Sequence, residues 1–459
     1  MMYSYHTKNN LVGVSQQGKS NIRQAFVSIF IFWSLVYLLV PEDGSQGLTL
    51  ITTYIAAFLA LLFLLFRMQR KGIISTNLAL VGLIIFSIKV AIGIGHYLFF
   101  MDSGYFFSNS PEYSYFPDYE WLNRKMLEIA EHWSDFGFGT FPRGFVILEQ
   151  KNVALLPYFS LLYYLGGNEH FLNISVVNSF HNILVAAVLA NFAASMASKK
   201  VVAAVFIICL MQPFGLFSSI LWRDSVGQFF LVAGAIIIAQ SSGKLIETGK
   251  LVFAVILMGL LRNIYVLVGV LSLVGRQIQA LLVKRAISRF QIALLTSFSF
   301  VAFYYSLPFI SSFYDFSGNK GFELTYMRDT GALVKGVLIG LIGPFPWTQI
   351  FDSATNGREY LPQEILQAVF NLTVLSLFFW AVINKKIRLN TQPHFTIIIT
   401  VLMVMGLGLL SYGHISYVTV GTVLLLPLIP NLRVFKFLGL YSFIFIINIT
   451  LGIVWAFLF

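Results

Sequence analysis

Apolar runs of about 20 residues recur along the chain, and this is the length that a helix needs to cross a bilayer. A soluble globule is excluded, because only 11% of the residues are charged whereas soluble domains carry roughly 25%. We therefore predict an all-α polytopic integral membrane protein, a single membrane domain over 1–459 with about eleven transmembrane helices. The runs cover 24–40, 48–66, 78–101, 171–195, 200–221, 225–240, 288–308, 364–383, 395–413, 415–431 and 437–458.

The net charge of +11 comes from short basic clusters between the apolar runs. This placement follows the positive-inside rule, and no nucleic-acid-binding motif accompanies it, so we expect no nucleic-acid partner. It predicts a cytoplasmic N-terminus and, with eleven spans, a C-terminus on the outer face. The basic residues then assigned to the inside are Lys8, Lys19, Arg23, Arg67, Arg70, Lys71, Lys199, Lys200, Lys244, Lys250, Arg276, Lys284, Arg285, Arg289, Lys385, Lys386, Arg388, Arg433 and Lys436, joined by Glu247 among the acids.

Two further apolar segments do not fit simple spans. Basic residues flank 251–275 on both sides, so we predict a re-entrant helical hairpin whose arms meet at Arg262; a single tilted span is the alternative. The segment 331–347 is short and rich in Gly and Pro, with acids in both flanks, which predicts a re-entrant dip from the outer face. The hairpin would place Arg262 at a cavity open to the outside.

The longest predicted outer loop, 102–152, combines 13 aromatic residues with eight acids. Aromatic faces with interleaved carboxylates suit sugars, although an aromatic belt at the headgroup level would look similar. Within the loop, 117–133 predicts an interfacial amphipathic helix that carries Tyr119 and Trp121 as candidate sugar-binding residues. Asp118 fits either an N-cap of this helix or a general base acting on a sugar hydroxyl.

Charges at membrane depth are costly and therefore mark candidate functional sites. Arg223 and Asp224 lie in a nearly loop-free turn between two spans, and Arg262 is predicted to project to the same side. Two converging arginines suit a diphosphate, whereas an ordinary short loop with mutually screening charges is the alternative. Lys89 lies mid-span without a carboxylate within one turn, so it either serves the same anion or finds a partner across the bundle. His181 is also deep in a span, where a packed, hydrogen-bonded role is the more usual one.

Arg143, Arg328 and Lys335 lie in predicted outer segments. Each fits either binding of a phosphate or acidic sugar, or the role of a solvated loop charge. Metal-binding and phosphate-loop motifs are lacking, the single Cys209 excludes a thiolate-rich site, and the histidines are scattered. We therefore expect neither a metal nor a soluble cofactor.

The basic, aromatic-rich chain with many spans, one long outer loop and outer-face arginines resembles the Wzy-type polysaccharide polymerases. The Arg-x10-Gly pattern of that family is met by Arg223 and Gly234, and it is not met around Arg262. The order of Asp118 to Leu122, the stretch LLPYFSLLYYLGG, WRDS, LLRN and GPFPW is also similar to that of the GT-C membrane glycosyltransferases. This second resemblance covers about 100–350 and implies a GT-C-like fold.

These resemblances imply an enzyme that joins polyprenyl-diphosphate-linked oligosaccharide units at the periplasmic face of the bacterial inner membrane. Arg223 and Arg262 would stabilise the diphosphate leaving group, and Asp118 or Asp224 would deprotonate the acceptor hydroxyl. Implied partners are the lipid-linked oligosaccharide, membrane lipid, a flippase and a chain-length regulator. The alternatives are a GT-C transferase that uses a polyprenyl-phosphate sugar, an O-antigen ligase and, as a non-enzyme, a flippase for lipid-linked oligosaccharide.

Overall fold

The computed structural model describes residues 6–39, 46–101, 117–142, 155–166, 171–213, 224–241, 247–259, 264–284, 362–387, 392–410 and 415–458. Every regular element within these residues is helical. The α-helices are α1 (His6–Leu39), α2 (Gln46–Arg70), α3 (Thr76–Met101), α4 (Pro117–Phe136), α5 (Leu155–Gly166), α6 (Phe171–Ala194), α7 (Lys199–Leu210), α9 (Asp224–Gln240), α10 (Thr248–Gly259), α11 (Ile264–Lys284), α14 (Pro362–Ile383), α15 (Gln392–Leu410), α16 (Ile415–Thr422) and α17 (Val434–Leu458). A 3-10 helix, η4 (Val423–Leu428), continues from α16.

Six of the described helices are long and apolar enough to cross a membrane. They are α1, α2, α3, α6, α14 and α17, and each coincides with a predicted run. The predicted runs 200–221, 225–240, 395–413 and 415–431 contain shorter described helices, and 288–308 lies outside the described residues. The chain is an all-α polytopic membrane protein, as the sequence predicts, while the number of spans stays a prediction.

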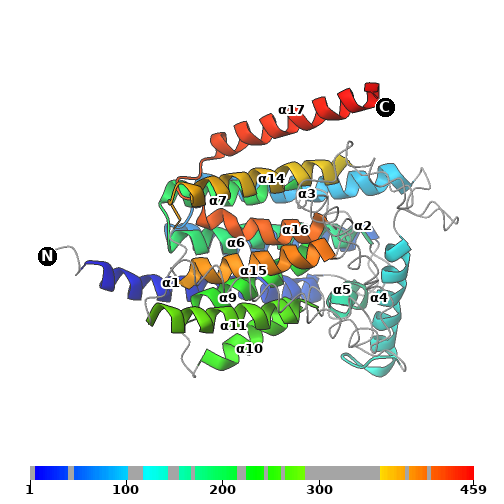
Figure 1. The fold of residues 1–459 in the computed structure, drawn as a ribbon. Helices are drawn as coiled ribbons and strands as arrows, with labels where there is room; N and C mark the ends of the chain where they lie inside the picture. The colour runs from blue at the N-terminus through cyan, green and yellow to red at the C-terminus, as the bar shows by residue number, and fades with distance from the viewer. Residues whose placement is uncertain are drawn as a thin grey trace.

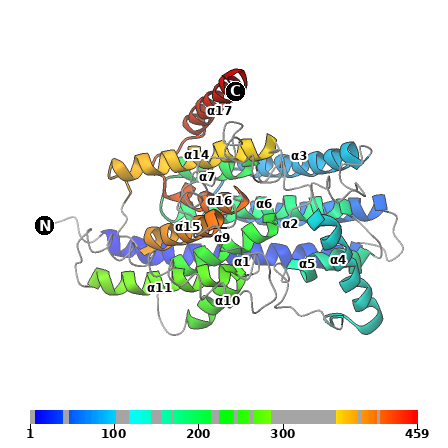
Figure 2. The same cartoon turned by 45° about the vertical axis from the view of Figure 1, so that its right-hand side comes forward.

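The long helices run side by side, and α4 crosses one end of the bundle (Figures 1 and 2). This end, which we call the α4 end, lies opposite the start of α1 (Figure 1). The centre of the bundle is α6, which packs against α1, α2, α3, α7 and α9. In an 18-residue apolar stretch within Leu172–Ala194, 94% of the residues are buried, so α6 has almost no contact with lipid.

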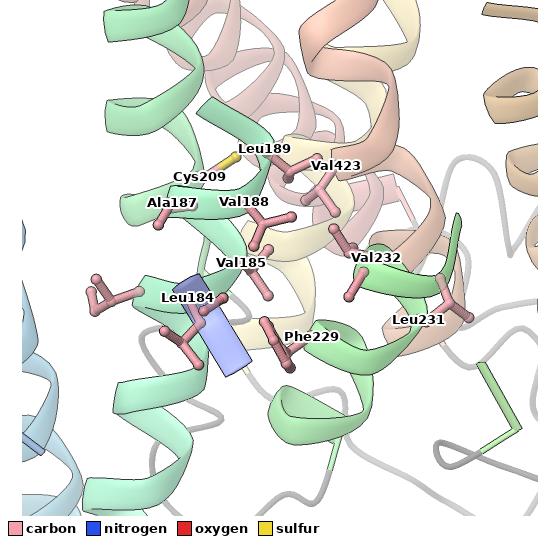
Figure 3. Packing of buried hydrophobic residues seen from close by; sticks show 14 of the residues in the cluster. Leu184, Val185, Ala187, Val188, Leu189, Cys209, Phe229, Leu231, Val232 and Val423 are labelled. Carbon is pink, nitrogen blue, oxygen red and sulfur yellow. The ribbon is translucent and has the colours of Figure 1, made fainter. Parts of the chain in front are cut away.

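The core around the second half of α6 is apolar. Leu184, Val185 and Val188 of α6 meet Phe229 and Val232 of α9 in one layer (Figure 3). Side chains of α7 and η4 close the same cluster from the other sides. Dispersion contacts of this kind hold helices together within a bilayer, where the hydrophobic effect contributes little to their association.

Glycines allow close approach of the helices that follow α9. A Cβ atom at Gly234 of α9 would lie 2.6 Å from the Ala254 carbonyl oxygen of α10. Gly259 and Gly269 leave similar room between α10 and α11, where added Cβ atoms would meet Val266 and Val255. Small residues at such crossings let backbones touch, as in other membrane helix pairs.

The predicted hairpin segment 251–275 folds as two antiparallel helices, α10 and α11, because Val255 faces Gly269 while Gly259 faces Val266. The chain enters and leaves this pair at one end, where Arg276 donates to the Ser241 carbonyl and Ser241 Oγ donates to Glu247 Oε2 at 3.1 Å. The arms are 12 and 21 residues long, not about eleven each, because α11 continues through the basic stretch to Lys284. The depth of the pair in a membrane stays a prediction.

Within the predicted outer loop 102–152, the structure describes only 117–142. Helix α4 begins at Pro117 as predicted and ends at Phe136, three residues after the predicted end. Ile129 and Trp133 are buried, and α4 packs against the short helix α5. The predicted dip 331–347 lies outside the described residues.

Candidate functional site

A polar stripe runs along the first half of α6, the half nearer to the α4 end. It consists of Ser175, Asn178, Ser179 and Asn182, whose i, i+3, i+4 and i+7 spacing places them on one face of the helix. All four are buried, with exposed fractions between 0 and 2%. Burying four polar side chains inside a membrane protein costs free energy unless they meet polar partners. The stripe therefore marks a polar interior at this end of the bundle.

The stripe meets the first turn of α9. Asn182 Nδ2 donates to Ser225 Oγ at 3.4 Å, and Ser225 is buried. Asp224 is the first residue of α9, so the backbone N–H groups that a helix leaves unpaired at its start lie beside the stripe. Such a helix start favours an anion through both the N–H groups and the helix dipole.

A second polar contact joins α9 to the residues that follow α7. The side-chain amides of Gln212 and Gln228 donate to each other at 3.2 and 3.4 Å, and both residues are fully buried. Gln228 lies one turn after Ser225, on the same side of α9. Polar groups thus continue along α9 from the stripe toward the middle of the bundle.

Several buried polar atoms in the first half of α6 have no hydrogen-bond partner among the described residues. They are the Oγ atoms of Ser175 and Ser179 and both side-chain polar atoms of Asn173, which lies on the opposite face of α6. Buried hydroxyl and amide groups of this kind are usually satisfied by protein, water or a ligand. Hydroxyls and amides both donate and accept, so they suit neutral ligands that also do both.

His181 is part of an aromatic cluster. Its Nδ1–H donates to the Val177 carbonyl at 2.8 Å, which leaves Nε2 to accept the Tyr158 hydroxyl at 2.9 Å. Tyr158 belongs to α5, and Phe229 and Phe230 of α9 pack around the imidazole. Both ring nitrogens of His181 therefore have protein partners, as expected of a packed histidine.

Helix α4 contributes an aromatic cluster at its C-terminal end. Trp133 Nε1 donates to the Thr140 carbonyl at 2.7 Å, and its ring contacts Phe138 and Tyr164. The turn that follows α4 needs Gly137 at a φ of 94°, a conformation that few other residues adopt. This cluster fixes α4 on α5 across the α4 end.

The predicted sugar-binding and base residues of α4 lie in its first two turns. Asp118 is the second residue of α4, whereas an N-cap residue directly precedes the first helical residue, Pro117. The predicted N-cap role of Asp118 is therefore wrong. A carboxylate in the first turn is still stabilised by the helix dipole. Tyr119 and Trp121 follow in the same helix, and the structure describes the backbone of all three.

Lys89 is the predicted anion-binding residue that the structure describes in full. It is fully buried near the middle of the span Thr76–Gly95, and among the described residues no hydrogen-bond partner reaches Nζ. The sequence leaves open whether Lys89 has a partner across the bundle. No hydrogen-bonded carboxylate partner is found among the described residues.

The other predicted site residues lie outside the described residues. They are Arg143, Arg223, Arg262, Arg328 and Lys335. Arg223 directly precedes α9 in the sequence. Because Gly234 packs against Ala254 in an antiparallel pair, α10 runs back toward the end of the bundle where α9 starts. The start of α9 thus lies beside the α6 stripe, and the last turn of α10 lies toward the same end of the bundle as the start of α9.

The stripe itself was missed by the sequence analysis. Its signal is present in the sequence as four polar residues at helical spacing within one apolar run, and a count at the 3.6-residue period would have found it. Among the described residues, no group of three or more His, Cys, Asp or Glu side chains forms a metal site. Comparisons with models of protein families, with curated proteins and with solved structures find no match to this chain.

Proposed function

We propose that this membrane protein is a glycosyltransferase of the polysaccharide-polymerase type, which joins polyprenyl-diphosphate-linked oligosaccharide units at the periplasmic face of a bacterial inner membrane. One observation carries the proposal: the buried stripe of Asn and Ser side chains lies beside the start of α9. Neutral hydrogen-bonding groups for sugar hydroxyls and an anion-favouring helix start are thus adjacent, as a sugar diphosphate requires.

In the proposed reaction the diphosphate is the leaving group. Arg223, next to the start of α9, and Arg262, between α10 and α11, would stabilise its developing charge. Asp224 or Asp118 would take the proton of the acceptor hydroxyl as that oxygen attacks the anomeric carbon. Tyr119 and Trp121 would stack on sugar rings at the α4 end. A flippase that supplies the lipid-linked units and a chain-length regulator are the proposed partners.

The test is the surface-polysaccharide ladder of a strain that lacks the protein, complemented with variants of it. We expect the deletion to leave a single repeat unit on its acceptor, and Arg262→Ala and Asp118→Ala to fail to restore long chains. The matched control is Asp135→Ala, an exposed acid of the same helix α4, which should restore the full ladder. Membrane levels of each variant are measured by immunoblot, so that loss of protein is not read as loss of activity.

The other outcomes assign the alternative functions. Long polymer that accumulates without its acceptor would indicate an O-antigen ligase. A ladder of normal length whose repeat unit lacks one sugar would indicate a GT-C transferase. Lipid-linked units that accumulate on the cytoplasmic side would indicate a flippase, and an unchanged ladder would refute a role in polymerisation.

A further inference from the structure

The apolar face of α4 continues beyond the part that the protein covers. Met126, Ile129 and Trp133 on this face are buried, and α4 packs against α5. Phe136 lies two turns after Ile129 and therefore on the same side of the helix. Its side chain is nevertheless 69% exposed. The apolar face thus ends in a large ring that the protein leaves mostly uncovered.

The turn that follows α4 presents a second exposed ring. Gly137 and Gly139 have φ angles of 94° and 86°, which favour glycine, although a Cβ atom at either would meet nothing within 4 Å. Phe138 lies between them and is 62% exposed. Trp133 Nε1 donates to the Thr140 carbonyl at 2.7 Å, and Thr140 Oγ1 donates to the Gly137 carbonyl at 2.7 Å. These hydrogen bonds hold the turn around Phe138 in one conformation.

Phe136 and Phe138 are supported by neighbouring rings. The Phe138 ring lies 4.8 Å from that of Trp133 and 5.8 Å from that of Tyr164 in α5, measured between centroids. The Phe136 ring lies 4.7 Å from the imidazole of His132. We call Phe136 and Phe138 the aromatic tip of α4. Transfer of two such rings out of water is favourable, so the tip suits an apolar partner.

The opposite face of α4 is polar. Glu131, Ser134 and Asp135 are exposed, and one turn before Ser134 and Asp135 the Lys125 ammonium binds the Glu128 carboxylate. A helix with a charged face and an apolar face is typical of a segment that lies in the plane of a membrane interface. The charged face of α4 therefore suits water, and its aromatic tip suits the adjoining lipid.

The position of α4 brings the aromatic tip to the edge of the bundle. In both views α4 crosses the end of the bundle, and its C-terminal end reaches the outer edge of the molecule on the side of α10 (Figures 1 and 2). On α10, Val252, Phe253 and Ile256 are exposed, as on a surface that lipid covers. Since the long helices cross the membrane, a helix across their ends runs along the membrane surface.

We infer that Phe136 and Phe138 insert into the lipid interface at the α4 end and anchor α4 on the membrane surface. Aromatic rings are favoured at the level of the lipid headgroups. The occupant is lipid because the tip lies at the edge of a membrane-spanning bundle and continues the apolar face of a helix whose other face is charged. This inference concerns the support of α4 and does not depend on the proposed glycosyltransferase function.

The test places a fluorophore at single positions of the full-length protein. In a Cys209→Ala background, Phe136→Cys and Phe138→Cys are each labelled with nitrobenzoxadiazole and reconstituted into phosphatidylcholine vesicles. A nitroxide on the lipid lies either near the headgroup or near the end of the acyl chain. Interfacial segments lie about 5–10 Å into the headgroup boundary, so the nitroxide near the headgroup should remove most of the fluorescence and the other one much less.

The matched controls are Glu131→Cys and Asp135→Cys, which place the same fluorophore on the charged face of α4. Their fluorescence should resist both lipid nitroxides and be quenched by iodide added to the water. At Phe136 and Phe138, iodide should quench weakly and the emission should shift to shorter wavelength. Thermal unfolding of each labelled variant verifies its fold, and because the two rings are tested separately, one folded variant keeps the test decisive.

Three results would overturn the lipid anchor. Quenching by iodide at Phe136 and Phe138, as strong as at Glu131, would show that the aromatic tip lies in water. Protection of both positions from iodide and from the lipid nitroxides would show that protein covers the tip, as a second copy of the chain would. Quenching by the lipid nitroxides at all four positions would show that the whole helix is embedded and that the tip is not a separate anchor.

Discussion

Helices α6 and α17 are both long enough to cross a membrane, yet they occupy opposite environments. In an 18-residue stretch of α6 within Leu172–Ala194, 94% of the residues are buried, against 11% over the 18 residues Val434–Leu451 of α17. Of the two segments, α17 is the more apolar. It packs mainly against α14 and lies apart from the rest of the bundle in both views (Figures 1 and 2).

Of these two helices, the more apolar one is the less buried. A helix that faces lipid gains from Phe and Ile on its surface, such as Phe435 and Phe443 of α17. A helix surrounded by protein can carry Asn and Ser, because buried polar side chains can be satisfied by neighbouring helices or by water. The polar content of α6 is therefore a sign of its central position in the bundle.

The largest expected effect comes from removing a buried ring of α6. Phe180 is fully buried and stacks on Phe32 of α1 with a centroid distance of 4.9 Å. Phe180→Ala leaves a cavity that the surrounding helices fill only in part, so we expect the free energy of unfolding to fall by about 3–5 kcal/mol. The measurement is unfolding by SDS in mixed micelles.

The matched control for this change is Phe443→Ala in α17, where the ring is 61% exposed. Detergent or lipid replaces that ring, so we expect a loss below about 1 kcal/mol. Equal losses in both variants would show that α17 is covered by protein and would remove the contrast between the two helices.

A second, smaller effect is expected at the glycine contacts. In Gly234→Ala the new methyl group would lie 2.6 Å from the Ala254 carbonyl oxygen and from Met258 Cγ. Pushing α9 and α10 apart should cost about 2–3 kcal/mol, as overpacking in protein interiors does. The measurement is again unfolding by SDS in mixed micelles.

Gly439 of α17 is the control for Gly234, because a Cβ atom there would meet nothing within 4 Å. Gly439→Ala should be neutral or stabilise the helix by up to about 1 kcal/mol. A destabilised Gly439→Ala with an unchanged Gly234→Ala would contradict the α9–α10 packing described above.

Much of this fold follows from the sequence by simple physical rules. Bilayer thickness sets the length of the apolar runs, so α6 and α17 are both predicted as spans. The amphipathic helix predicted over 117–133 is found as α4, and Ile129 and Trp133, one turn apart, lie on its buried face. Basic residues on both sides of 251–275 predict a re-entrant hairpin; α10 and α11 pack as an antiparallel pair, while their position in a membrane stays a prediction.

What the sequence could not provide is the identity of each neighbour. Gly234 was noted for its distance from Arg223 in the chain, but its contact with Ala254 depends on the crossing of two helices. Lys89 is predicted to bind an anion or to find a partner across the bundle, and the structure shows that the helices packed around it, α2, α6 and α7, carry no carboxylate within their described bounds. Each residue of the α6 stripe is tolerable alone, whereas the contact of Asn182 with Ser225 of α9 is a property of the fold.

The smallest expected effect is the loss of one tyrosine hydroxyl, and its cost in stability should differ between Tyr158 and Tyr441. Tyr158→Phe removes the donor to His181 Nε2, and the ring of this buried histidine then keeps an unpaired acceptor. Interhelical hydrogen bonds in membrane proteins contribute about 0.6 kcal/mol on average and up to about 1.7, and we expect a loss within that range.

Tyr441→Phe in α17 is the counterpart. It removes a donor to the Leu366 carbonyl, with an oxygen distance of 3.1 Å. Leu366 lies within α14, so its carbonyl keeps the N–H bond of its own helix, and the loss should be only a few tenths of a kcal/mol. A double variant, Tyr158→Phe with His181→Phe, should recover most of the loss, because no acceptor then remains unpaired. If Tyr158→Phe costs no more than Tyr441→Phe, the hydrogen bond to His181 does not stabilise the centre of the bundle.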